Sequence, residues 1–424
     1  GWGMSSEWPV QRLDQIAEIN PARKVRKGSV VPFVDMAALP QHSRDIGAEG
    51  VLVREAKGAG AHFQNGDTLL ARITPCLENG KTAQVRCLDG DAIAEGSTEF
   101  IVLCGKDPED NDFIYYLCRE PAFREYAIGR MEGTSGRQRV SWQSIAAYEF
   151  AFPPPDERRA AACVLSALDD RITLLRETNA TLEAIAQALF KSWFVDFDPV
   201  RAKMEGRAPE GMDEATAALF PDALEETELG PVPKGWRYST IGESFILTMG
   251  QSPPGDTYNE AGDGLPFYQG RTDFGFRFPS QRVFCTAPTR LAEPGDTLVS
   301  VRAPVGDVNM ALEKCCVGRG VAAVRHPNGC RSFAFYATRG LRSRFDLFDS
   351  EGTVFGSINK KDFQALPVIE PSGDVLVAFD EIAAPIDRRI VGNEEQIRTL
   401  ATLRDTLLPR LISGQLRVPE ATLA

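Results

Sequence analysis

Two stretches of the chain place apolar side chains in alternating steps of three and four residues. This spacing is typical of the seam of an α-helix that pairs with another helix in a coiled coil. The first seam, inside a predicted helix from Asp156 to Val195, consists of Leu165, Leu168, Ile172, Leu175, Asn179, Leu182, Ala186, Leu189 and Trp193. The second consists of Ile386, Ile390, Asn393, Ile397, Leu400, Arg404, Leu407 and Leu411. With one seam each, the two helices are expected to pair with each other.

Polar and helix-breaking residues refine this prediction. Asn179 and Asn393 lie on the seams, where a buried amide costs stability but fixes the register; a solvated helix end is the alternative. The Asp-Pro pair at 198–199 predicts the end of the first helix, and the Ser-Gly pair at 413–414 predicts the end of the second. Pro385 lies within the second pattern and predicts a kink or a late start of that helix.

The chain also repeats itself. NGDTLLARITP (65–75) aligns with PGDTLVSVRAP (294–304), and ALDDRI (167–172) aligns with PIDRRI (385–390). The offsets of the two alignments differ only by the length of a loop. We therefore predict a tandem duplication in which each copy is a globular domain followed by a long helix.

The globular parts combine strand-like and helix-like patterns. Short apolar runs such as FIVLC, TLLARI, TLVSVR and VAAVRH are bounded by Gly, Pro or Asp and predict strands. Residues 112–128 and 331–347 carry aromatic side chains at helical spacing, which predicts equivalent helices with their rings in the core. The expected fold class is α/β (α+β) domains in tandem, separated by two long paired helices, with an internal pseudo-twofold repeat.

The charge of the chain is unevenly distributed. Its net charge of −12 at pH 7 would disfavour a nucleic-acid partner if it were spread evenly. Much of the acidity lies in residues 199–235, a stretch rich in Pro, Gly, Ala and Glu that we predict to be an exposed linker with at most a short helix. The segments on either side are close to neutral, so either of them could carry a local basic patch.

The sequence predicts neither a catalytic nor a metal site. Nine cysteines include no CxxC pair and only three histidines are present, so no metal-binding cluster is expected. GxSxG, a Walker lysine and a recognisable Cys–His motif are also missing. No apolar run reaches the roughly 18 residues that cross a membrane, and we expect a cytoplasmic protein.

Four segments resemble the specificity (S, or HsdS) subunits of type I restriction-modification systems. They are residues 152–206, beginning FPPPDERR and ending DPVRAKMEG; LGPVPKGW (229–236); ITPCLENGK (73–81); and LRDTLLPRLISGQLRV (403–418). The resemblance covers almost all of Trp8 to Val418. It implies target recognition domains at 4–151 and 236–370, a central conserved helix at 152–198, the acidic linker at 199–235 and a C-terminal conserved helix at 371–418.

The resemblance also implies a function. In this family each recognition domain reads one half of a bipartite site in double-stranded DNA, and the two helices pair antiparallel and dock two modification (methyltransferase) subunits, which restriction/motor subunits join. The chain would be a non-catalytic targeting subunit without a cofactor of its own. S-adenosylmethionine would bind to the methyltransferase partner, and ATP and Mg to the motor/nuclease partner. The alternative is a coiled-coil scaffold with duplicated protein-binding heads, which the acidic total favours.

Candidate DNA contacts follow from the chemistry of recognition. Base edges are read mostly by Arg, Lys, Asn and Gln, and phosphates by any basic or hydroxyl group. In the first copy the candidates are Arg72, Thr74, Asn79, Lys81, Ser135, Arg137, Gln138 and Arg139. In the second copy they are Gln269, Arg271, Arg302, Ser357, Asn359, Lys360 and Lys361, with Arg342 and Arg344 as weaker phosphate candidates. The alternative for each is an ordinary solvated side chain.

LFKSWFVDFDPV, residues 189–200, places four aromatic side chains at the end of the first helix. Phe190, Phe194 and Phe197 follow at i, i+4 and i+7, on a face that two paired helices alone would leave in water. We hypothesise a docking surface for the modification subunits, formed by Phe190, Trp193, Phe194, Phe197, Leu408 and Ile412. Packing of this stripe against the chain's own domains is the alternative, and the sequence leaves it open.

Overall fold

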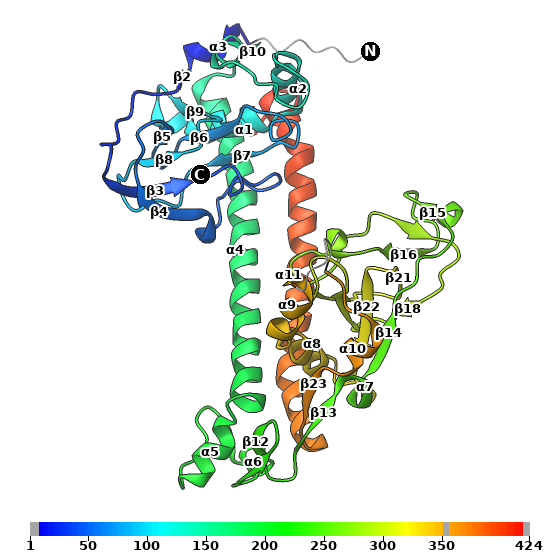
Figure 1. Ribbon diagram of the computed structural model, residues 1–424. Helices are drawn as coiled ribbons and strands as arrows, with labels where there is room; N and C mark the ends of the chain where they lie inside the picture. Colours follow the sequence, from blue (N-terminus) through cyan, green and yellow to red (C-terminus); the bar gives the residue numbers. More distant parts are fainter. Residues whose placement is uncertain (1–7, 351–355, 419–424) are drawn as a thin grey trace. The chain divides into compact units, whose positions relative to one another are not determined.

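The computed structural model describes residues 8–350 and 356–418 and divides the chain into two compact units. Unit 1 comprises Gly1–Thr178 and Asn393–Ala424, and unit 2 comprises Asn179–Gly392. Two helices of 40 residues each, α4 (Pro155–Phe194) and α11 (Gly373–Ile412), contribute to both units (Figure 1). Residues 4–7 of the first predicted domain lie outside the described part of the chain.

Two four-stranded sheets and a ribbon form the globular part of unit 1. The first sheet has the antiparallel order β2-β9-β6-β7, the second has the order β4-β3-β8-β5 with β3 and β8 parallel, and the ribbon is β1-β10. The strands are β1 (Val10–Arg12), β2 (Ala17–Ile19), β3 (Val30–Val34), β4 (Val51–Glu55), β5 (Ala61–Phe63), β6 (Thr68–Ala71), β7 (Thr82–Gln84), β8 (Ala94–Gly96), β9 (Phe100–Gly105) and β10 (Glu149–Ala151). The helices are α1 (Asn111–Arg119), which packs on β6, β7 and β9, α2 (Pro121–Gly129) and α3 (Trp142–Ala146).

Unit 2 repeats this sheet order. The antiparallel sheet β14-β22-β19-β20 corresponds to β2-β9-β6-β7, and the ribbon β13-β23 corresponds to β1-β10. The mixed sheet β15-β17-β16-β21-β18 again contains one parallel pair, β16 and β21. The repeated GDTL segment forms β6 in one unit and β19 in the other, so the repeat in the sequence corresponds to a repeat in strand order.

The remaining elements belong mostly to unit 2. Its strands are β11 (Leu224–Thr227), β12 (Gly230–Pro233), β13 (Arg237–Thr240), β14 (Ile246–Met249), β15 (Tyr258–Asn259), β16 (Leu265–Tyr268), β17 (Phe284–Cys285), β18 (Leu291–Ala292), β19 (Thr297–Ser300), β20 (Val308–Met310), β21 (Cys315–Val317), β22 (Val321–Arg325) and β23 (Pro367–Glu370). Its α-helices are α5 (Asp198–Met204), α6 (Glu214–Ala218), α7 (Ile241–Ser244), α8 (Arg331–Arg339), α9 (Arg342–Ser350) and α10 (Lys360–Gln364). Short 3-10 helices lie at Leu13–Gln15, Ala48–Gly50, Pro108–Asp110, Gly255–Thr257 and Arg271–Asp273.

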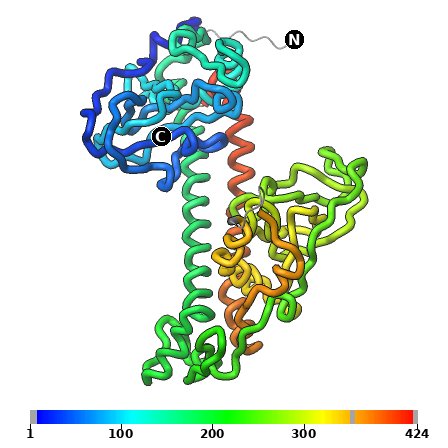
Figure 2. The backbone as a smooth tube through the Cα atoms, in the orientation of Figure 1, coloured from blue at the N-terminus to red at the C-terminus, as the bar shows by residue number. Residues whose placement is uncertain are grey.

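Helices α4 and α11 contact each other within each unit. In unit 1, Leu165 shares a buried cluster with Leu408 and Leu411, and Ile172 shares another with Ile397. In Figure 2 the trace of α11 ends in unit 1, which also contains the first part of α4. In unit 2, the rings of Phe190 and Phe379 lie 5.9 Å apart. The apolar spacing in the sequence therefore corresponds to contacts between these two helices.

Two details of the long helices differ from or sharpen the sequence prediction. Helix α11 begins at Gly373, so the late start predicted from Pro385 is wrong. Pro385 has no N–H to donate to the carbonyl of Glu381, four residues earlier in the helix. Both residues are exposed, so water can hydrogen-bond to this carbonyl. Asn179 and Asn393 are completely buried, which excludes the alternative of solvated helix ends.

The acidic segment after α4 is folded, so its prediction as an exposed linker with at most a short helix is wrong. Residues 198–233 form α5, α6 and the hairpin β11-β12. Val200, Phe220 and Val232 are buried in the core of unit 2 together with Trp236. These few apolar anchors hold the segment on the unit, whereas acidic side chains such as Glu225 and Glu226 stay exposed. The composition of this segment reflects its exposed residues, which are the majority, and does not reveal which few apolar side chains are buried.

Asp380 on α11 accepts hydrogen bonds at the N-terminal end of α8. The N–H of Phe333 donates to its Oδ1 at 2.9 Å. Burial raises the pKa of Asp380 to about 6, although hydrogen bonds from the backbone of Phe333, Ser332 and Arg331 lower it. An unfolded Asp has a pKa of about 3.9, so the folded chain binds this proton more tightly than the unfolded chain does.

The pKa of Asp380 gives a pH prediction for the variant Asp380→Asn. The stability contributed by the protonated carboxyl is present below about pH 4 and is lost as the pH rises through about 6, by up to about 3 kcal/mol. Asparagine keeps an acceptor oxygen but does not ionise. Between pH 4 and pH 7 the thermal midpoint of the parent chain should therefore fall more than that of the variant. Equal pH dependence of the two midpoints, measured by circular dichroism, would contradict the prediction.

Candidate nucleic-acid interface

In unit 1, the loop that follows β6 meets the second predicted contact segment. Ile73 and Arg139 form an isolated antiparallel bridge. The N–H of Thr74 donates to the Gln138 carbonyl at 3.0 Å, and the N–H of Val140 donates to the Arg72 carbonyl at 3.0 Å. The fold thus brings residues 72–81 and 135–139, which are far apart in the sequence, into one loop cluster.

Several predicted contact residues of unit 1 have partners inside the unit. Arg139 binds Glu99 with an Nη2–Oε1 distance of 2.7 Å, and this hydrogen bonding raises the pKa of Arg139. Lys81 Nζ donates to the Met36 carbonyl at 2.8 Å, and Thr74 Oγ1 donates to Glu78 Oε1 at 2.8 Å. These three side chains hold the loop cluster in shape.

The other predicted residues of this cluster are more open to solvent. Asn79, Ser135 and Arg137 are exposed, and Arg72 and Gln138 are half-buried. All of the predicted DNA contacts of unit 1 stay predictions.

Unit 2 builds the equivalent loop cluster in the same way. Arg302 and Ser357 form an isolated bridge, the N–H of Ala303 donates to the Gly356 carbonyl at 2.9 Å, and the N–H of Ile358 donates to the Val301 carbonyl at 3.0 Å. Asn359 caps α10, because its Oδ1 accepts from the N–H of Asp362 at 2.9 Å. Lys360 and Lys361 of α10 are exposed. Arg302 and the predicted contact residues within 357–361 are therefore neighbours in unit 2.

Two hollows that share Arg271 gather arginines on unit 2. A hollow of about 340 Å³ is lined by Gln269, Arg271, Arg302 and Arg319 among others. A second, of about 440 Å³, is lined by Arg271, Arg339, Arg342 and Asp307 among others. Asp307 forms ion pairs with both Arg271 and Arg342, the latter at 2.6 Å. The result is a run of exposed guanidinium groups, which suits an anionic ligand.

Arg319 and Arg339 were not predicted from the sequence. Arg319 lies between two glycines before β22, and Arg339 is the last residue of α8. Neither residue stands in a motif that identifies it, and only the folding of the sheet brings Arg319 to the same hollow as Arg302. Arg344, a weaker sequence candidate, is exposed and lines a different, largely apolar hollow.

The aromatic stripe is buried in unit 2. Phe190, Trp193, Phe194 and Phe197 are each at most 4% exposed. Ring centroids of Phe194 lie 5.1 Å from Phe333 and 5.2 Å from Phe379. Leu408 and Ile412 are buried in a core cluster of unit 1. The hypothesis of a docking surface made of these side chains is therefore wrong, because the globular domains cover the face that a helix pair alone would expose.

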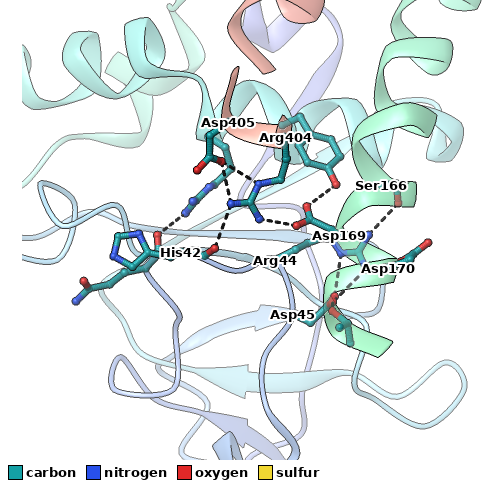
Figure 3. Close-up of polar contacts among 12 residues, drawn as sticks. His42, Arg44, Asp45, Ser166, Asp169, Asp170, Arg404 and Asp405 are labelled. Carbon is teal, nitrogen blue, oxygen red and sulfur yellow. Dashed lines mark hydrogen bonds and ion pairs between the residues drawn. The ribbon is translucent and has the colours of Figure 1, made fainter. Parts of the chain in front are cut away.

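Buried ion pairs fasten each globular domain to the long helices. In unit 1, Arg404 of α11 binds Asp169 of α4 (Figure 3). Asp169 also accepts a hydrogen bond from Tyr116 Oη. Arg44 donates to Ser166 Oγ of α4 at 2.8 Å and lies beside Asp170. In unit 2, Arg277 contacts Glu183 of α4 and Asp387 of α11. These contacts hold the globular part of each unit against the helices of that unit.

Known proteins resemble the chain along nearly its whole length. No family model matches it. The type I restriction enzyme MjaX specificity subunit of Methanocaldococcus jannaschii is 25% identical, with 97% of this chain and 94% of the relative covered. The type I restriction enzyme HindI specificity subunit of Haemophilus influenzae is 26% identical, with 84% of this chain and 87% of the relative covered.

The chain is a homologue of type I restriction enzyme specificity subunits. The resemblance seen in its sequence is thereby confirmed. Its fold agrees, because the crystal structure of a type I restriction-modification system S subunit from M. genitalium matches with a TM-score of 0.60 at 16% identity, covering 97% of both chains. This specificity-subunit homologue is a mixed helix and strand protein with the duplicated strand order described above.

In residues 8–350 and 356–418, no group of three or more His, Cys, Asp or Glu side chains is placed to hold a metal ion. Within the same ranges, no helix is both long and apolar enough to cross a membrane.

Proposed function

We propose that the chain is the non-catalytic specificity subunit of a type I restriction-modification complex. In this role it binds a bipartite target in double-stranded DNA, with one half-site for each recognition domain, and scaffolds the methyltransferase subunits. The single observation that carries the proposal is the full-length similarity to curated specificity subunits, in a chain whose sheet and loop cluster occur twice. The alternative, a scaffold with protein-binding heads, is not favoured by these relatives.

The finer features of the role belong to the same proposal. Helices α4 and α11 form an antiparallel coiled coil that connects the two recognition domains and carries two modification subunits, which restriction/motor subunits join. S-adenosylmethionine binds to the modification subunit, and ATP and Mg bind to the motor subunit. The contacts of α4 with α11 in each unit support the coiled coil, and the arginine-lined hollows of unit 2 support DNA binding.

A base-modification map tests the proposal. DNA is taken from cells that express the cognate methyltransferase subunit with and without this chain. We expect a split motif, two short half-sites around a fixed unread gap, that appears only when the chain is present. A chain in which unit 1 is exchanged for that of another specificity subunit should change one half-site and leave the other. An unchanged map, with the chain still bound to the methyltransferase, would refute the DNA-specificity role.

A further inference from the structure

Two arginines flank one end of the β19–β22 strand pair and line the same hollow. The antiparallel register pairs Ser300 with Val321, and the N–H of Val301 then donates to the Gly320 carbonyl at 3.0 Å. Arg302 follows Val301, and Arg319 precedes Gly320 in the turn that the N–H of Val321 closes on the Gly318 carbonyl. Both arginines are exposed and line the hollow of about 340 Å³ with Gln269. Arg271, which is paired with Asp307, lines this hollow too, so the fold presents two further guanidinium groups and one amide to the same small space.

This arrangement has an electrostatic cost that unit 1 avoids. Two like charges that line the same hollow repel each other. Among the described residues neither Arg302 nor Arg319 has an ion-pair partner, whereas the neighbouring Arg271 is paired with Asp307. The β6–β9 pair of unit 1 has the same register, Ala71 with Phe100, and the corresponding outward positions hold the uncharged Ile73 and Thr98. An uncompensated arginine pair that only one copy of the duplication carries points to an anionic or acceptor-rich ligand.

The backbone around the pair is built for close approach. A Cβ on Gly320 would lie 2.3 Å from the Gln269 carbonyl oxygen, so only glycine lets the start of β22 lie against the Gln269 segment. This contact places Arg319 beside Gln269. Gly270, which also lines the hollow, has open space where its Cβ would be. A flat ligand edge can therefore enter without meeting a side chain at these two positions.

We propose that Arg302 and Arg319 read guanine in the half-site bound by unit 2. Each guanidinium offers a planar fork of donors that matches the O6 and N7 acceptors of guanine in the major groove, and two free forks beside an amide give a donor-rich surface. Gln269 lies within the same hollow and reads the adjacent base. This inference rests on the proposed function, and it adds the class of base that one domain reads and a residue, Arg319, that the sequence did not identify.

The test uses the complex of this chain with its methyltransferase subunits and the motif from the modification map. Binding is measured by fluorescence anisotropy on the cognate duplex and on duplexes with 7-deazaguanine, which lacks the N7 acceptor, at each guanine of the unit 2 half-site. At one or two positions we expect affinity to fall roughly 5- to 150-fold, the range for a bidentate base contact. Arg302→Ala and Arg319→Ala should each cause a loss of similar size and remove the sensitivity to 7-deazaguanine at one position.

The control is Arg331→Ala, an exposed arginine beside Gly295 at the other end of β19. It should leave both affinity and base preference unchanged. A unit 2 half-site without guanine would overturn this inference but not the proposed function. The same holds if the variants weaken binding to all duplexes equally and lower the slope of log affinity against log salt by about one, as the loss of a phosphate contact does. Should either variant fail to fold, the 7-deazaguanine series on the parent complex still decides. A parent complex that has no sequence preference would overturn the proposed function as well.

Discussion

Replacing Arg277 by alanine is expected to destabilise unit 2 by about 3–5 kcal/mol, the usual cost of removing one partner of a buried ion pair. The side chain of Arg277 is completely buried. Its Nη1 donates to Glu183 Oε1 at 3.0 Å, its Nη2 contacts Asp387, and its guanidinium lies 3.5 Å from the centre of the Phe335 ring. Alanine would leave two carboxylates without this cation and open a cavity over the ring.

The pKa of Asp387 explains why the loss is large. Burial raises the pKa of this carboxyl, and the charge of Arg277 and a hydrogen bond from Ser332 lower it in part. Without Arg277 the carboxyl keeps the burial and loses the compensating charge, so its pKa should rise further. The variant should therefore lose less stability at pH 5 than at pH 8, because the protonated acid tolerates burial better than the carboxylate does.

Hydrogen exchange at the β22 amides of the full-length chain measures the opening free energy of unit 2. The matched control is Arg237→Ala, whose partner is Glu370 at 2.7 Å but whose side chain is 66% exposed; it should cost at most about 1 kcal/mol. Adding Asp387→Asn to Arg277→Ala should recover part of the loss. An Arg277→Ala chain with exchange as slow as that of the Arg237→Ala chain would disprove this account.

The second large effect is expected in unit 1, where Arg404→Ala should also cost about 3–5 kcal/mol. Arg404 and Asp169 are 5% and 3% exposed, and their Nη1–Oδ1 distance is 2.6 Å. The second carboxylate oxygen accepts from Tyr116 Oη at 2.7 Å. Arg404 Nη2 reaches the His42 carbonyl at 3.4 Å (Figure 3). One guanidinium thus ties α11 to α4 and to the loop that carries His42.

A control for Arg404→Ala is available on the same guanidinium. Asp405 also contacts Arg404, at 2.8 Å, but its side chain is 63% exposed, so Asp405→Ala should change stability by less than about 1 kcal/mol. Exchange at the β9 amides reports on unit 1 and should accelerate strongly for Arg404→Ala only. Similar exchange in the two variants would mean that burial of the Asp169 pair does not set the cost.

The two long helices show how far the sequence predicts this fold. Their apolar spacing of three and four residues predicted both helices and their contact, because a helix must bury one stripe of its surface. The spacing could not identify what covers the opposite face. Whether Phe194 faces a partner or the chain's own domain was therefore left open by the sequence, and in the structure residues as distant as Phe333 and Phe379 enclose it.

The candidate DNA interface divides in a similar way. The repeated GDTL strand located the loops after β6 and β19, and residues with DNA-binding chemistry in those loops were predicted from their type. Which of them are free for a ligand is a tertiary property. Arg139 is paired with Glu99, forty residues earlier in the chain. Arg302 instead shares a hollow with Arg319, which lies in the turn before β22.

The repeated acidic residues of ALDDRI and PIDRRI show the same division between sequence and tertiary structure. The sequence by itself determined that Asp169 and Asp387 occupy equivalent positions on two helices, because helical periodicity fixes the face that a residue occupies. Only the tertiary structure decided their cations: Arg404 from a helix in unit 1, and Arg277 from a loop 110 residues away in unit 2. A buried carboxylate needs a positive charge within reach, and the packing of each domain determines which arginine supplies it.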